Sequence, residues 1–99
     1  ELDNSLPESF TLGQNYPNPF NPSTTISFNL PEKTSVNLSI YNILGQAVAI
    51  LKNETLPSGQ HKVEWNSNNM NGQPVTSGVY FYRLETDSFS DVKKMLLLR

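Results

Sequence analysis

Apolar and polar residues alternate in short runs along this chain, and this period of two constrains the fold more than any other feature. Ile26, Phe28 and Leu30 are separated by polar residues, and the same spacing recurs between residues 36 and 40. Alternation places every second side chain on one face of a β-strand, so each run predicts a half-buried strand. No stretch shows the period of an amphipathic helix, and the chain is therefore predicted to be all-β.

Further strands are predicted where β-branched and aromatic residues gather. The predicted strands cover residues 25–30, 36–40, 47–51, 61–65, 79–85 and 92–98. The first two are expected to form a hairpin, whereas residues 53–59 and 66–74 are predicted as loops because they are rich in Pro, Gly and Asn. Trp65 is expected in the core. Short strands about ten residues apart indicate an immunoglobulin-like, antiparallel two-sheet β-sandwich of about seven strands.

The length and the first residues suggest one domain that follows another. A chain of 99 residues suits a single core. Residues 1–9 are polar and contain Pro7, so we expect them to be a linker from an upstream domain, and residues 10–99 to be the folded domain. The chain starts at Glu1 without a charged and apolar leader, so any export leader is expected in a longer precursor.

Composition excludes several partners. Seven Lys or Arg against nine Asp or Glu give a net charge of −2 with no basic stripe, so no nucleic acid is expected. The absence of cysteine excludes disulfides, thiolate nucleophiles and cysteine zinc sites. The longest apolar run, residues 95–98, is far shorter than the ~20 residues of a membrane-spanning helix, so no transmembrane segment is expected.

Catalytic chemistry is not predicted. The single histidine, His61, alternates in register with Val63 and Trp65, which favours a structural place at the edge of the core over catalysis. The serines lie in no nucleophile elbow, and no glycine-rich phosphate loop precedes a helix. We therefore expect no enzyme, with no catalytic residue, no metal and no cofactor.

Two binding alternatives stay open. Residues 66–72 offer amide and hydroxyl oxygens followed by glycine, as calcium loops do, but they contain no carboxylate, so a plain turn is favoured. A set of aromatic residues fits either a platform for sugar rings or, with more weight, core packing. These residues are Tyr16, Phe20, Tyr41, Tyr80 and Tyr82.

Several blocks of sequence resemble the signatures of one family. Residues 15–26 resemble the N-terminal signature of the type A C-terminal sorting domain of type IX secretion, a relative of the immunoglobulin-like module of flagellar hook-capping proteins. Residues 36–46, 72–84 and 93–99 resemble the later signatures and the usual ending. The motif residues are Pro17, Asn18, Pro19, Phe20, Gly45, Gly78 and Tyr80.

One departure from the family concerns the residues after Trp65. Related modules often carry acidic residues there, whereas this chain has Asn66, Asn68 and Asn69. The departure weakens any proposal of a metal site in this loop.

The resemblance implies a sorting label rather than a reactive site. It implies that an upstream cargo, a secreted hydrolase or adhesin, reaches the periplasm, that this domain is recognised by the outer-membrane type IX translocon, and that the cargo is then secreted or attached to the cell surface. A sortase-like peptidase is expected to cut within residues 1–9. An immunoglobulin-like accessory or carbohydrate-binding module of a secreted enzyme is one alternative, and a passive spacer in a multi-domain surface protein is another.

The terminal residues are the expected recognition element. They are Lys93, Lys94, Met95, Leu96, Leu97, Leu98 and Arg99. We expect them to form a strand near a sheet edge, where exposed backbone groups pair with a receptor strand and the cations orient it. An equal alternative is that residues 95–98 are ordinary core residues flanked by charges that prevent aggregation.

Overall fold

The computed structural model describes residues 7–99. This part of the chain contains seven strands and no helix. The strands are β1 (Thr11–Leu12), β2 (Thr24–Leu30), β3 (Thr34–Tyr41), β4 (Ala47–Leu56), β5 (Gly59–Trp65), β6 (Gly78–Thr86) and β7 (Ser90–Leu97). Most of the predicted linker, residues 1–6, lies outside the described residues, so the boundary after residue 9 stays a prediction.

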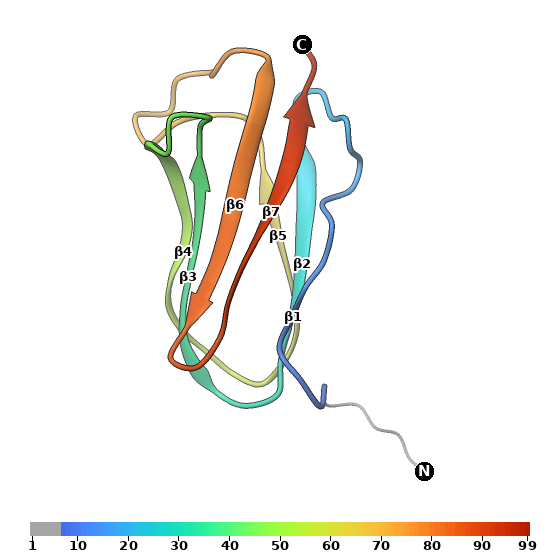
Figure 1. The fold of residues 1–99 in the computed structure, drawn as a ribbon, viewed down its shortest axis with the longest axis vertical. Helices are drawn as coiled ribbons and strands as arrows, with labels where there is room; N and C mark the ends of the chain where they lie inside the picture. The colour runs from blue at the N-terminus through green and yellow to red at the C-terminus, as the bar shows by residue number, and fades with distance from the viewer. Residues whose placement is uncertain (1–6) are drawn as a thin grey trace.

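The strands form two antiparallel sheets that face each other (Figure 1). One sheet has the order β1-β2-β5 and the other has the order β4-β3-β6-β7. The first described residues lie at one end of the long axis, and the C-terminus lies at the opposite end (Figure 1). This arrangement confirms the predicted immunoglobulin-like sandwich.

The expected hairpin between the first two predicted strands is wrong. β2 pairs with β1 and β5, while β3 pairs with β4 and β6, so residues 31–33 cross from one sheet to the other. Alternation does not show whether two successive strands pair in one sheet or lie in opposite sheets. Strands that pair in one sheet and strands that face each other across a sandwich both turn their apolar side toward the same core.

The predicted loop over residues 53–59 is also wrong. β4 continues to Leu56 and β5 begins at Gly59, so only Pro57 and Ser58 form the turn. The polar residues read as a loop belong to an edge strand, where the side chains of Lys52 and Glu54 lie 3.4 Å apart on the surface. Charged side chains on an edge discourage pairing with another chain, which explains their presence in a strand.

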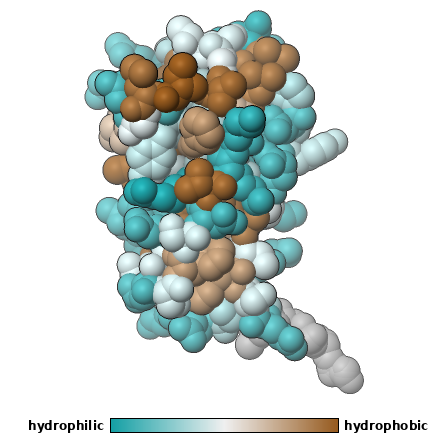
Figure 2. Space-filling view, viewed as in Figure 1, coloured by the Kyte–Doolittle hydropathy of each residue, from teal (hydrophilic) through white to brown (hydrophobic). Residues whose placement is uncertain are grey.

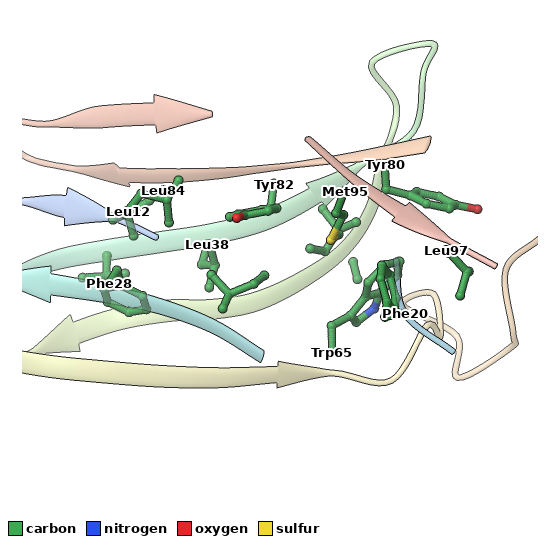
Figure 3. Packing of buried hydrophobic residues seen from close by; sticks show 14 of the residues in the cluster. Leu12, Phe20, Phe28, Leu38, Trp65, Tyr80, Tyr82, Leu84, Met95 and Leu97 are labelled. Atoms are coloured by element: carbon green, nitrogen blue, oxygen red, sulfur yellow. The ribbon is translucent and has the colours of Figure 1, made fainter. Parts of the chain in front are cut away.

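The inward-facing residues of the alternating runs fill the space between the sheets. The buried apolar residues are Leu12, Phe20, Ile26, Phe28, Leu30, Val36, Leu38, Ile40, Ala49, Trp65, Tyr80, Tyr82, Leu84, Met95 and Leu97. Trp65 is 2% exposed, as expected, and its ring lies 5.9 Å from that of Phe20 and 5.5 Å from that of Tyr80. These rings gather beside Leu97, near the end of β7 (Figure 3). Burial of each large apolar side chain contributes about 1.5–3 kcal/mol.

Candidate functional site

The terminal strand divides the expected recognition residues between two environments. Met95 and Leu97 face inward and are buried, which confirms that part of this tail belongs to the core. Lys94 and Leu96 project from the opposite face of the sheet, because successive side chains of a strand alternate. The partly buried Lys93 shares the inward-facing side of β7 but lies toward its start. The folded domain therefore presents only part of the tail to a partner.

The outer edge of β7 is already paired within the chain. We call residues 14–20 the strap. The backbone N–H of Phe20 donates to the carbonyl of Leu96, and the N–H of Leu98 donates to the carbonyl of Phe20, both at 3.0 Å. The side-chain oxygen of Asn18 accepts from the N–H of Leu96 at 3.0 Å, and the amide of Gln14 donates to the carbonyl of Lys94 at 2.9 Å.

This pairing corrects one expectation. β7 is an edge strand, as predicted, but its backbone groups near the C-terminus are not free for a receptor strand. Further back along the strand, the N–H of Val92 donates to the side chain of Asp91 at 2.9 Å. A receptor strand that added to this edge between Lys94 and Leu98 would first have to displace the strap.

The strap also holds the other sheet, so it closes one side of the sandwich. The backbone groups of Tyr16 and Thr25 exchange two hydrogen bonds, each 2.9 Å long, along the part of β2 that the short β1 does not reach. The side chain of Asn15 donates to the hydroxyl of Thr24 at 2.9 Å, and that hydroxyl donates to the carbonyl of Pro17 at 2.8 Å. Figure 1 shows this segment running beside β2 and then reaching the end of β7.

A buried tyrosine fixes the start of the strap from inside the core. The hydroxyl of Tyr82 donates to the carbonyl of Gly13 at 2.6 Å and accepts from the N–H of Asn15 at 2.8 Å. Burial raises the pKa of Tyr82 to about 12, an effect to which the negative charge of Asp91 adds and which the hydrogen bond from Asn15 opposes. The hydroxyl therefore stays protonated at neutral pH and serves as a structural link.

The motif residues have structural positions around this unit. Pro17, Asn18 and Pro19 are exposed in the strap, while Phe20 is buried against Trp65. Two further motif residues have positive φ angles: Gly45, in the turn between β3 and β4, at 79°, and Gly78, the first residue of β6, at 150°. The buried Tyr80 donates its hydroxyl hydrogen to the carbonyl of Thr76 at 2.7 Å, which holds the loop before β6.

The last residue ties the C-terminus to the loop between β5 and β6. The side chain of Arg99 donates to the carbonyl of Val75 at 2.7 Å and to that of Ser67 at 3.2 Å. Within the same loop, the side-chain oxygen of Asn69 accepts from the backbone N–H groups of Asn71 and Gln73. The loop that suggested calcium thus uses this oxygen to stabilise its own turn.

The remaining candidate residues have structural surroundings. His61 stacks on Phe28 with ring centroids 5.3 Å apart, and its Nε2 lies 2.9 Å from the carbonyl of Pro57. Three of the five aromatic residues considered for a sugar platform are buried, so only Tyr16 and the half-buried Tyr41 remain on the surface. Over residues 7–99, no three acidic or histidine side chains cluster as a metal site would require. The same range contains no helix capable of spanning a membrane.

Comparison with known proteins places this arrangement in a family. Over residues 14–98, the sequence matches the family described as the secretion system C-terminal sorting domain. The chain belongs to this family. The matched range includes both the strap and β7, and the resemblance seen in the sequence is confirmed. No match was found among curated proteins.

Solved structures share the fold of this sorting domain. PorZ, a surface component of the type IX secretion system of Porphyromonas gingivalis, has a TM-score of 0.60 and 21% identity, covering 93% of this chain and 12% of that one. Dimeric latent PorU from the same organism has a TM-score of 0.67 and 19% identity, covering 86% of this chain and 9% of that chain. FlgD from P. aeruginosa has a TM-score of 0.60 and 22% identity, covering 75% of this chain and 59% of that chain. The sorting domain thus spans a small part of the first two chains.

Proposed function

We propose that this sorting domain is a non-catalytic label that directs a protein joined to its N-terminus from the periplasm through the outer membrane by the type IX secretion system. One observation carries the proposal beyond the family match. The N-terminal signature and the terminal strand are hydrogen-bonded to each other through Phe20 and Leu96. The two family motifs therefore form one structural unit, which exists only when the whole domain has folded.

The translocon recognises this unit through its exposed side chains. With the edge of β7 occupied by the strap, the groups left for a partner are the side chains of Lys94, Leu96 and Leu98. Lys94 and Leu98 are exposed and Leu96 is partly exposed. Lys94 supplies the positive charge among these side chains, and this charge orients an acidic receptor surface during encounter. Lys93 lies on the inward-facing side of β7, and the side chain of Arg99 is bonded to the loop between β5 and β6.

The upstream cargo is released at the far end of the molecule. A sortase-like peptidase cuts within residues 1–9, after which the cargo is secreted or attached to the cell surface. The first described residues and the end of β7 lie at opposite ends of the long axis (Figure 1). A receptor at the C-terminal end would therefore lie far from residues 7–9, the described part of this linker.

Secretion of a reporter tests this function. Residues 1–99 are fused to the C-terminus of a periplasm-exported reporter in a host with the secretion system, and the reporter is measured in the medium and in the periplasm. We expect the fusion to reach the medium and the unfused reporter to stay in the periplasm. Equal retention of both in the periplasm would overturn the proposed function.

Surface substitutions test which side chains are read. We expect the triple variant Lys94→Ala, Leu96→Ser, Leu98→Ser to fold, as judged by a thermal melt, and to stay in the periplasm. The matched control replaces Gln60, Lys62 and Glu64, which are exposed on β5, with alanine and keeps secretion. Full secretion of the folded triple variant would show that the label is read elsewhere.

A further inference from the structure

The outer face of the four-stranded sheet contains a groove to which the proposed sorting function assigns no role. By the outer face we mean the side turned away from the core, onto which every second residue of β3, β6 and β7 projects. The groove has a volume of about 290 Å³. It is lined by Tyr41, Asn42, Ile43, Gly45, Phe81, Arg83 and Val92.

One charged side chain lies within this groove. The guanidinium carbon of Arg83 lies 5.0 Å from the centre of the Tyr41 ring, and its Nη2 donates to the Tyr41 hydroxyl at 2.8 Å. Nη2 also lies 3.7 Å from a carboxylate oxygen of Glu85, a long contact between surface groups, which contributes little to stability. Tyr41 thus fixes one side of the guanidinium.

The other side of this guanidinium is unsatisfied. The Nε of Arg83 is buried and has no hydrogen-bond partner, although 40% of the side chain as a whole is exposed. A buried donor without an acceptor is unfavourable, and an acceptor that drew the guanidinium outward would relieve it. A carboxylate suits this position best, because it accepts two parallel hydrogen bonds from the Nε and Nη edge of arginine.

Apolar side chains surround this charge. Figure 2 shows a band of hydrophobic residues across the end of the outer face that bears the C-terminus, with hydrophilic residues prevailing below it. Ile43 and Leu44 are 71% and 77% exposed in the turn between β3 and β4, and Val92 on β7 is 50% exposed. Ile43 and Val92 both line the groove, and exposed apolar residues gathered on one face are common at interaction sites.

The charges on this face define the partner further. Lys94 pairs across the strands with Phe81, so it lies beside the groove on the same face as Arg83. Glu85 is the acid in contact with Arg83. Lys94 takes part in neither of the two ion pairs found among residues 7–99. The face therefore favours an acidic partner over a basic one.

We propose that this groove binds a polypeptide segment in which an aspartate or glutamate lies between apolar side chains, and that this segment belongs to the secretion machinery. The carboxylate pairs with Arg83, and the apolar side chains contact Ile43 and Val92. The identity of the partner as secretion machinery rests on the proposed function, whereas the chemistry of the segment rests on the groove alone.

Selection from a peptide library tests the chemistry. The 99-residue chain is immobilised and exposed to phage that display random 12-residue peptides, and an enriched peptide is synthesised for calorimetry. We expect the enriched peptides to share an acidic residue flanked by apolar ones. Arg83→Gln should weaken binding by on the order of tenfold or more, because it removes a charge-assisted hydrogen bond.

Two matched variants complete the library test. Val92→Asp should weaken binding of the synthesised peptide by a similar factor, because it places a like charge beside the carboxylate of the peptide. Met70→Asp alters an exposed apolar residue outside the groove and should leave the affinity unchanged. Enrichment without an acidic residue, or equal affinity of the wild type and folded Arg83→Gln, overturns the proposal.

The secretion assay separates this proposal from the function on which it rests. If the wild-type fusion is not exported, the proposed function fails, and the groove is then judged by the peptides alone. If the wild type is exported and the folded Arg83→Gln and Val92→Asp fusions are exported equally well, the groove is not a translocon contact and the proposed function stands. Retention of both variants, with export of Met70→Asp, supports the proposal.

Discussion

The backbone of Phe20 is hydrogen-bonded on both sides to the last strand, donating to the carbonyl of Leu96 and accepting from the N–H of Leu98. Its side chain is buried against Trp65, so the same residue anchors the strap in the core and pairs it with the sheet edge. The strap therefore covers the C-terminal part of the edge that the sequence suggested as a site of strand addition, and this is why the proposed recognition uses side chains on the faces of β7.

Replacement of Asn18 by alanine should loosen this edge without unfolding the domain. The side chain of Asn18 is exposed and supplies the acceptor for the N–H of Leu96. One hydrogen bond contributes about 0.5–1.5 kcal/mol, so the Leu96 amide should exchange with solvent roughly two- to tenfold faster in native-state hydrogen exchange. The Leu98 amide, which is bonded to the backbone of Phe20, should change less.

The control for this variant is Asn21→Ala, which alters an exposed asparagine just after the strap. It should leave exchange at Leu96 unaffected. If Leu96 exchanges at the wild-type rate in the Asn18→Ala variant, then the strap is held by its backbone alone.

Gly45 should be required for its backbone conformation rather than for space. Its φ is +79°, and a side chain added there would meet no atom within 4 Å. Gly45→Ala should therefore cost about 1–2 kcal/mol in urea unfolding, from the strain of a left-handed residue. Gly45→Asn should cost less, because asparagine tolerates this conformation better. Equal stability of the alanine variant and the wild type would contradict this reason.

Much of the fold follows from alternation, and its failures have a common cause. The runs ending in Leu30 and Ile40 predict strands because every second residue is apolar and faces one core. The pairing of β2 with β5 is not predictable in this way, because alternation specifies a face and not a neighbour. β1 is too short, at two residues, to show any period.

The candidate site was predictable only in part for a similar reason. The terminal tail is recognisable by its family resemblance, and the structure confirms that Met95 and Leu97 are buried. The strap was not predictable from pattern, since its contacts with Leu96 use a backbone group of Phe20 and the amide of Asn18. The groove around Arg83 likewise depends on which strands lie side by side. A local pattern carries no signal for either arrangement.

Deletion of residues 93–99 should unfold the domain, so it does not test recognition by itself. It removes Met95 and Leu97, which are almost fully buried, and the edge to which the strap is bonded. The loss of two such side chains costs about 4–10 kcal/mol, which is comparable to the total stability of a domain of this size. Trp65 fluorescence should shift to that of the unfolded chain.

A shorter deletion provides the matched comparison. Removal of Leu98 and Arg99 alone takes away exposed residues and the contacts with Val75 and Ser67, so the domain should stay folded with a modest loss of stability. A native Trp65 emission spectrum after deletion of residues 93–99 would contradict the role assigned to the tail in the core.

Tyr82 should make the domain sensitive to alkaline pH. Its pKa is raised from 10.0 to about 12 in the folded state, chiefly because burial disfavours the charged phenolate. A folded-state pKa above the unfolded value means that the contribution to stability is complete below pH 10 and is lost as the pH rises through 12. One pKa unit corresponds to ~1.4 kcal/mol, so the unfolding free energy should fall by roughly 2–3 kcal/mol over this range.

Tyr82→Phe separates this effect from the titration of other groups. The substitution leaves the N–H of Asn15 and the carbonyl of Gly13 without their partner, so the variant should be about 1–3 kcal/mol less stable at neutral pH. Its unfolding free energy, measured in urea from pH 7 to pH 12, should then decline less steeply above pH 10 than that of the wild type, because the shifted group is gone. The exposed Tyr16 provides the control, since Tyr16→Phe should keep the full slope. Parallel curves for Tyr82→Phe and the wild type would mean that another group causes the alkaline loss, and that the buried hydroxyl acts only through its two hydrogen bonds.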